Sequence, residues 1–308
     1  MPPETRYAHN GDVRVAYEVF GDPASGEPLL LINGLDFQMV WWPDGFCQQL
    51  VDRGFAVVRF DNRDTGLSTH FDSPHRESPW RALLGQVKPA YSTLDMLDDA
   101  AAVMDAVGWK SAHVLGGSMG GAIAQAMALV HPDRVRSLIS CVSVPADASP
   151  IRLLTYIKFS VFSKFRKAEA WDSRAAEIDN LVLLYRAIAS PGYPFPEEWA
   201  RTAAGISYDR SPRDPKSTQR QLAAGRAQKL PKLSAVKAPT LVISGEDDPI
   251  IKVKGGRDTA RRISGARLVT YPGMGHNFPE ELWPDIIEQI AQVAGLAARA
   301  GSECWRRE

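Results

Sequence analysis

The sequence AHVLGGSMGG at residues 112–121 decides the expected fold. An apolar, β-prone run ends in Gly116-x-Ser118-x-Gly120, and an alanine-rich helical pattern follows at once. A serine hydroxyl is a weak nucleophile until a base removes its proton, and a sharp strand-to-helix turn exposes the hydroxyl to such a base. Glycines on both sides leave room for close packing of strand against helix. The stretch therefore predicts a nucleophile elbow with Ser118 at its tip.

Short apolar runs alternate with helical patterns on both sides of this turn. The patterns predict strands at 13–20, 29–32, 56–60, 112–117, 137–144, 240–244 and 267–271, and helices at 44–54, 92–108, 119–131, 255–263 and 280–298. Strands that alternate with helices form a mainly parallel β-sheet covered by helices on both faces. We therefore expect an α/β protein.

The alternation is interrupted in the second half of the chain. Between residues 145 and 235 the sequence is helical, aromatic and Pro-containing, with no short buried strand. We interpret residues 145–235 as a helical lid (cap) inserted into a core made of residues 1–144 and 236–298, and residues 299–308 as a C-terminal tail. The length of 308 residues by itself suits one large domain with an insertion or two small domains.

Composition excludes several classes of function. Lys+Arg and Asp+Glu number 36 each, so no net field attracts nucleic acid or anionic lipid, and we expect neither nucleic-acid binding nor stable membrane association. Cys47, Cys141 and Cys304 lie far apart, which indicates no disulfide framework and no zinc site; no metal and no cofactor are expected. Without an apolar leader or a membrane-length apolar run, a cytoplasmic location is the expectation. The oligomeric state stays open.

Ser118 requires a base, and His276 is the strongest candidate among six histidines. It lies in PGMGH at 272–276, directly after a predicted strand, where a glycine-rich loop can aim an imidazole across the carboxyl edge of a parallel sheet. The other histidines lie in polar loops, inside a strand or at a helix end, and we interpret them as surface or core residues: His9, His70, His75, His113 and His131.

The base in turn requires a carboxylate that orients it. Glu246, Asp247 and Asp248 all follow the predicted strand at 240–244. Pro249 restricts the backbone of the residue before it, so Asp248 is favoured over Asp247. Position after the strand would by itself allow any of the three carboxylates, so the choice of Asp248 depends on Pro249.

The order Ser118, Asp248, His276 is the chain order of an α/β-hydrolase. The chain resembles that family over nearly its whole length. More narrowly, it is similar to the aclacinomycin methylesterase-like carboxylic ester hydrolases, and the similar segments are LLING at 30–34, RFDNRDTGLS at 59–68, GGSMG at 116–120, GMGH at 273–276 and, within the lid, RQLAA at 220–224. The resemblance implies a carboxylic ester hydrolase with a helical lid.

The resemblance also implies an oxyanion hole made by the backbone N–H groups of Leu35 and Met119. Many family members have His-Gly where this chain has Asn33-Gly34, and the departure leaves a backbone donor in place. The charged stretch DNRDTG at 61–66 is interpreted as structural, with charges that satisfy one another.

Aromatic and methionine side chains near these motifs predict an apolar substrate pocket, although about half of such residues are expected to be plain core. The pocket candidates are Phe37, Trp41, Trp42, Met274, Phe278, Tyr156 and Phe159. The leading hypothesis is a serine carboxylesterase that hydrolyses a medium or bulky hydrophobic ester through an acyl-enzyme intermediate. The alternatives are a serine aminopeptidase similar to proline iminopeptidase and, less favoured, a non-catalytic ligand-binding protein. An aminopeptidase would need an inward lid carboxylate from Glu169, Glu177, Glu197 or Glu198.

Overall fold

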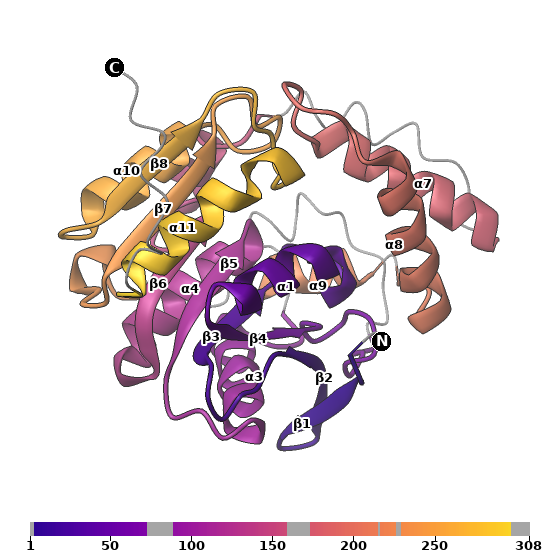
Figure 1. Cartoon of the computed structure of the whole chain (residues 1–308), viewed down its shortest axis with the longest axis horizontal. Coiled ribbons are helices and arrows are strands. Elements are labelled where there is room, and N and C mark those ends of the chain that lie inside the picture. The colour runs from indigo at the N-terminus through magenta and orange to yellow at the C-terminus, as the bar shows by residue number, and fades with distance from the viewer. Residues whose placement is uncertain (1–2, 73–88, 159–172, 215, 226–228, 297–308) are drawn as a thin grey trace.

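The computed structural model describes residues 3–72, 89–158, 173–214, 216–225 and 229–296. Its centre is an eight-stranded sheet in the order β1-β2-β4-β3-β5-β6-β7-β8 (Figure 1). The strands are β1 (Arg6–Asn10), β2 (Val13–Phe20), β3 (Glu27–Ile32), β4 (Phe55–Phe60), β5 (Ala112–Gly117), β6 (Val135–Cys141), β7 (Thr240–Gly245) and β8 (Arg267–Tyr271). β2 is antiparallel to β1 and β4, and the other neighbouring pairs are parallel. The predicted α/β fold is therefore confirmed.

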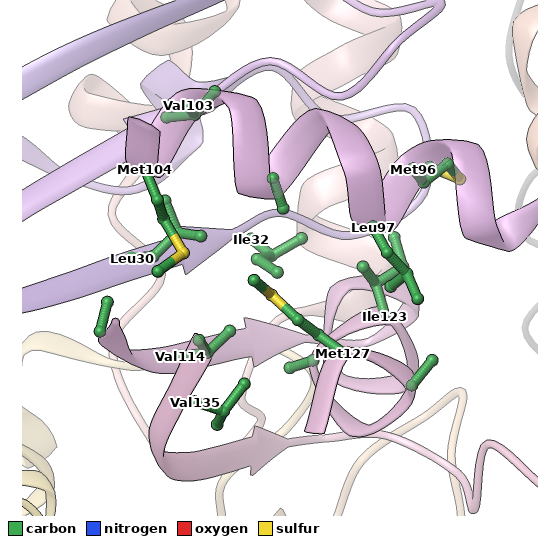
Figure 2. Close-up of a cluster of buried hydrophobic side chains, with 14 of the residues drawn as sticks. Leu30, Ile32, Met96, Leu97, Val103, Met104, Val114, Ile123, Met127 and Val135 are labelled. Atoms are coloured by element: carbon green, nitrogen blue, oxygen red, sulfur yellow. The ribbon is translucent and has the colours of Figure 1, made fainter. Parts of the chain in front are cut away.

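Helices cover both faces of the sheet. On one face lie α3 (Thr93–Ala106), α4 (Met119–Val130) and α10 (Lys254–Arg262), and on the other α1 (Asp44–Asp52) and α11 (Trp283–Val293). Figure 2 shows side chains of α3 and α4 packed on residues of the sheet: Leu30, Ile32, Met96, Leu97, Val103, Met104, Val114, Ile123, Met127 and Val135. In the part of the chain described, no helix is both long and apolar enough to cross a membrane.

Several element ends differ from the sequence-based prediction for local reasons. β1 was not predicted because only Ala8 of its residues is buried, as is typical of an edge strand. β6 ends at Cys141 rather than near 144, because Val142 has a φ of 43° and leaves the extended region. α11 ends at Val293, followed by Gly295 in the left-handed region, whereas the prediction ran to 298. The predicted tail at 299–308 lies outside the described residues.

The segment between β6 and β7, residues 145–235 of the prediction, is called the insertion below. It contains α5 (Pro150–Leu154), α7 (Arg174–Ile188), α8 (Glu197–Arg210), α9 (Ser217–Ala224) and the short helix η3 (Leu233–Ala235). α7 and α8 pack against each other and lie apart from the helices that cover the sheet (Figure 1). The end of the insertion returns to the sheet, since Ala224 and Leu233 belong to the core beside α3 and α4.

Three buried ion pairs connect the loop after β4 with surrounding helices. Asp61 pairs with Arg210 of α8 at 2.9 Å, and Asp64 pairs with Arg220 of α9 at 2.8 Å. In the same loop, Arg63 makes a pair of 2.6 Å with an α3 carboxylate, Asp99. A buried charge without a partner is costly, so these pairings explain why a charged loop is tolerated inside the protein. The loop therefore has the structural role that its sequence indicated.

Two backbone segments approach each other very closely at the turn from β5 to α4. A Cβ added to Gly116 would lie 2.0 Å from the carbonyl oxygen of Gly120, and a Cβ added to Gly120 would lie 2.1 Å from that of Ile32. These oxygens belong to the backbone and cannot rotate away. Gly117 differs, because its added Cβ would meet only the Trp42 ring, at 3.6 Å.

We therefore expect Gly116→Ala to destabilise the fold by about 3 kcal/mol or more, because β5 and α4 must separate to admit the methyl group. Gly117→Ala is the matched control, with an expected cost below about 1 kcal/mol because its Cβ makes an ordinary contact. Urea unfolding of both variants measures the difference. Equal midpoints would show that the close approach does not constrain the fold.

Candidate active site

The candidate catalytic residues follow the carboxyl ends of three parallel strands. Ser118 follows β5, Asp248 comes after β7, and His276 comes after β8. Side chains at this edge of a parallel sheet converge on a common site. The three candidate residues therefore follow strand ends at the same edge of the sheet, although they are far apart in sequence.

Ser118 forms the turn between β5 and α4. Its φ of 55° and ψ of −118° are strained for a residue other than glycine, and neighbouring groups hold it there. Its N–H donates to the carbonyl of Cys141 at 2.9 Å, and its own carbonyl accepts from the Ser143 hydroxyl at 2.7 Å. Ser118 Oγ has no hydrogen-bond partner among the described residues and is only half-buried. The backbone of Ser118 is thus held by two hydrogen bonds, while its hydroxyl makes none within the described residues.

His276 and Asp248 form a short, buried pair. His276 Nδ1 lies 2.6 Å from Asp248 Oδ2, with the two side chains 6% and 1% exposed. The other oxygen, Asp248 Oδ1, accepts the N–H groups of Ile250 at 2.7 Å and Ile251 at 2.8 Å. Because an ionised carboxylate only accepts hydrogen bonds, the proton resides on Nδ1 and Nε2 is left as the basic nitrogen. The pair has the geometry of a general base and its orienting acid.

The neighbouring carboxylates are engaged elsewhere. Asp247 accepts the N–H of Gly273 at 2.9 Å, and Glu246 accepts the hydroxyl of Thr270 at 2.8 Å. Asp248 is therefore the one of the three carboxylates that contacts His276. The contact selects one residue from a group that sequence position left open.

The insertion supports the loop that carries His276. The N–H of His276 donates to the carbonyl of Ile188 at 2.9 Å, and that of Gly275 donates to the hydroxyl of Ser190 at 2.8 Å. A Cβ on Gly275 would lie 2.4 Å from the carbonyl oxygen of Ala189. Sequence analysis did not single out residues 188–190, because no local motif marks a contact between segments so distant in the chain.

Trp42 contacts the neighbours of both Ser118 and His276. Its Cη2 would lie 3.6 Å from a Cβ on Gly117, and its ring centroid lies 6.0 Å from that of Phe278. The Trp42 side chain is 7% exposed, and its indole N–H has no acceptor among the described residues. One aromatic ring therefore packs against both the elbow and the histidine loop.

The loop after β3 lies against the elbow. A Cβ on Gly34 would lie 3.3 Å from Ser118 Cβ and 3.9 Å from its Oγ. Asn33 stabilises this loop, since its Nδ2 donates to the carbonyl of Gln38 at 2.6 Å while its Oδ1 accepts the N–H of Gly34 at 2.9 Å. Its side chain thus orders the backbone at the site where relatives are expected to have histidine.

Two backbone donors near Ser118 are unused. Met119 is the first residue of α4, so its N–H has no partner within the helix. The N–H of Leu35, next to Gly34, also lacks an acceptor among the residues described. Neither N–H group has a hydrogen-bond acceptor among the described residues.

The predicted pocket residues fall into different environments. Met274 is fully buried in the core between the sheet and α11, and Tyr156 is fully buried with its hydroxyl donating to Asp258 of α10 at 2.8 Å. These contacts favour structural roles for both side chains. Trp41 is 7% exposed and donates its indole N–H to Ser207 Oγ at 2.9 Å.

The remaining pocket candidates are less enclosed. Phe37 and Phe278 are partly buried, and Phe37 packs edge-on against Trp41 with ring centroids 5.0 Å apart. Trp42 and Phe278 are the candidates that contact the surroundings of Ser118 and His276. Phe159 lies outside the described residues.

The insertion's candidate carboxylates do not form an amine site in the described part of the chain. Glu177 is 4% exposed, and burial raises the pKa of its carboxyl group. It accepts the N–H of Arg213 at 2.8 Å and lines a cavity of about 20 Å³, which has room for about one water. Glu197 pairs with Arg186, Glu198 is exposed, and Glu169 lies outside the described residues.

Comparisons with known proteins agree with this architecture. The family described as the α/β hydrolase fold matches residues 27–281. Rhodomycin D methylesterase of Streptomyces peucetius is 31% identical over 292 residues, covering 89% of this chain and 93% of the relative. A second rhodomycin D methylesterase, from Streptomyces sp. (strain C5), is 28% identical over 294 residues, with 89% and 93% covered.

Solved structures show the same fold at lower sequence identity. The esterase RhEst1 from Rhodococcus sp. ECU1013 superposes with a TM-score of 0.70 and 19% identity, covering 95% of this chain and 99% of that chain. The enol-lactonase from Burkholderia xenovorans LB400 gives a TM-score of 0.65 and 22% identity, with 94% and 100% covered. With the family match extending over most of its length, the chain belongs to the α/β-hydrolase fold family.

Proposed function

We propose that this protein is a serine carboxylesterase that hydrolyses a medium or bulky hydrophobic carboxylic ester. The observation that carries the proposal is the 2.6 Å pair of His276 and Asp248 at the sheet edge where the strained Ser118 turn presents a free hydroxyl. The relatives named as methylesterases support an ester as substrate and favour a methyl ester in particular.

The proposed reaction proceeds through an acyl-enzyme. Ser118 Oγ attacks the ester carbonyl carbon while His276 Nε2 takes its proton, and the charge that develops on the carbonyl oxygen is stabilised by the N–H groups of Leu35 and Met119. The protonated His276, held by Asp248, then donates that proton to the departing alcohol oxygen as the C–O bond breaks. A water molecule then loses a proton to His276 Nε2 and attacks the acyl carbon. The bond from that carbon to Ser118 Oγ breaks, His276 returns the proton to Oγ, and the acid is released.

The apolar side chains beside the site support a hydrophobic substrate. Trp42 and Phe278 are aromatic, mostly buried, and packed against neighbours of the reacting groups. Phe278 remains partly exposed, and an ester whose acyl or alcohol portion is apolar would gain free energy by covering that exposed surface, whereas a small polar ester would not. We therefore propose a hydrophobic ester as the substrate class.

We expect the purified protein to hydrolyse p-nitrophenyl esters and methyl esters of polycyclic acids, and Ser118→Ala to abolish turnover because the nucleophile is gone. Release of p-nitrophenol or of the free acid measures the rates. Fluorophosphonate labelling of the wild type, absent in Ser118→Ala, separates an activated serine from a mere binding protein. Turnover of aminoacyl or prolyl p-nitroanilides in preference to esters would contradict the proposal, and so would activity confined to acetate esters.

Asp248→Asn is expected to lower kcat by about 10³-fold to 10⁴-fold. An asparagine can still accept the N–H groups of Ile250 and Ile251, but its amide group faces His276 as a donor and favours the wrong tautomer. Asp247→Asn is the matched control, with an expected change of less than about tenfold because, among the described residues, the Asp247 carboxylate accepts a hydrogen bond from the Gly273 N–H alone. Steady-state ester hydrolysis compares the two variants, and the reverse ranking would refute Asp248 as the acid.

A further inference from the structure

Asp36 has an unusual backbone conformation directly after the proposed oxyanion donor Leu35. Its φ is 64°, in the left-handed region that residues other than glycine seldom occupy. Asparagine and aspartate tolerate this region better than other side chains, yet a single such residue still needs support from its surroundings. The sources of that support lie in the insertion.

The carboxylate of Asp36 is held by the start of α9. It accepts hydrogen bonds from the Arg213 guanidinium, from the hydroxyl of Ser217 and, at 2.7 Å, from the hydroxyl of Thr218. The Asp36 side chain is 7% exposed. Ser217 and Thr218 are the first residues of α9, where the helix dipole favours a negative charge. One buried carboxylate therefore anchors this helix to the loop after β3.

Gln221, one turn further along α9, holds the backbone of the same residue. Its Oε1 accepts the N–H of Asp36 at 2.9 Å, while its Nε2 donates to the carbonyl of Arg63 at 2.9 Å and to the hydroxyl of Thr65 at 2.8 Å. The Gln221 side chain is thus satisfied on both sides, and the residue is only 1% exposed. Side chain and backbone of Asp36 are both bound by α9.

We propose that Asp36 is a positioning residue through which α9 of the insertion fixes the backbone that presents the Leu35 N–H to the oxyanion. The inference rests on the proposed function, because it assigns a task within the same site. Asp36 itself does not touch the substrate in this scheme. The insertion would then contribute to catalysis through the oxyanion hole.

This role predicts an effect on kcat rather than on KM. The charge that the Leu35 N–H stabilises is small in the bound ester and large in the tetrahedral transition state. A displaced donor therefore weakens transition-state binding while leaving ground-state binding nearly unchanged. A residue that merely stabilised the fold would lower the amount of active protein and leave the kinetic constants of the folded fraction intact.

Three substitutions at Asp36 separate the hydrogen bonds from the backbone conformation. Asp36→Ala removes every acceptor and is expected to lower kcat about 10-fold to 100-fold, with KM changed by less than about threefold. Asp36→Asn keeps one acceptor oxygen and the tolerance for left-handed backbone, so it should lose less activity than Asp36→Ala. Asp36→Gly relieves the strain without restoring the contacts and should remain as slow as Asp36→Ala. Full activity of Asp36→Gly would overturn the proposal.

Asp147 provides a matched control for loss of a contact between insertion and core. Its carboxylate, 13% exposed, accepts from Arg262 of α10 and from the N–H of Leu233 at 3.3 Å, and it makes no contact with the loop after β3 among the described residues. Asp147→Ala should lower the unfolding temperature but leave kcat unchanged. Thr218→Val, which keeps the side-chain shape and removes one donor to Asp36, covers the case in which Asp36→Ala does not fold; we expect kcat to fall about threefold to tenfold.

A trifluoromethyl ketone analogue of the ester gives a second readout, because its adduct with Ser118 places an oxyanion in the hole. Its inhibition constant should rise in Asp36→Ala in proportion to the fall in kcat, and should not change in Asp147→Ala. An unchanged inhibition constant, a rise in KM at constant kcat, or equal kinetics of Asp36→Ala and Asp147→Ala would overturn the inference alone. Absence of Ser118-dependent ester turnover in the wild type would instead refute the proposed function and the inference with it.

Discussion

The close approach of β5 and α4 is the constraint on which the rest of the site depends. With the carbonyl oxygen of Gly120 only 2.0 Å from where a Cβ of Gly116 would lie, strand and helix meet without side chains between them. The chain must therefore reverse direction within one residue, which places Ser118 at a positive φ and its hydroxyl outside the packed turn. The same reversal brings the N–H groups at the start of α4 next to Ser118, the proposed nucleophile.

The insertion is bound to the parts of the core that carry the proposed chemistry. Ile188 at the end of α7 and Ser190 just after it hold the His276 loop by accepting two of its backbone N–H groups, and α9 holds Asp36 beside the proposed oxyanion donor. Between them, Arg210 and Arg220 neutralise buried aspartates of the loop after β4. Breaking a buried ion pair strongly lowers the stability of the fold, because each charged partner would then remain desolvated and unpaired. The described part of the insertion thus holds in place the loops that carry the proposed site residues.

Sequence patterns were most informative where backbone geometry restricts residue type. Gly116 and Gly120 of the elbow and Gly275 before His276 are required by contacts that admit no Cβ, and such requirements appear directly in the sequence. Patterns were least informative at element ends and at the edge of the sheet. β1 has a single buried apolar residue, and the end of β6 depends on the unusual φ of Val142, which no local signal announces.

The sequence by itself determined the fold class, the Ser118 turn and the placement of a histidine after the last strand, because each depends on short-range periodicity or on a tight turn. Only the tertiary structure decided that Asp248, rather than its two acidic neighbours, contacts His276, and that Tyr156 and Met274 are engaged in core packing. The hydrogen bonds between Asp36 and α9, which are separated by some 180 residues of chain, are likewise visible only in the tertiary structure. The physical reason is that a hydrogen bond between distant segments depends on how whole elements pack, and the identities of the two residues do not specify that packing.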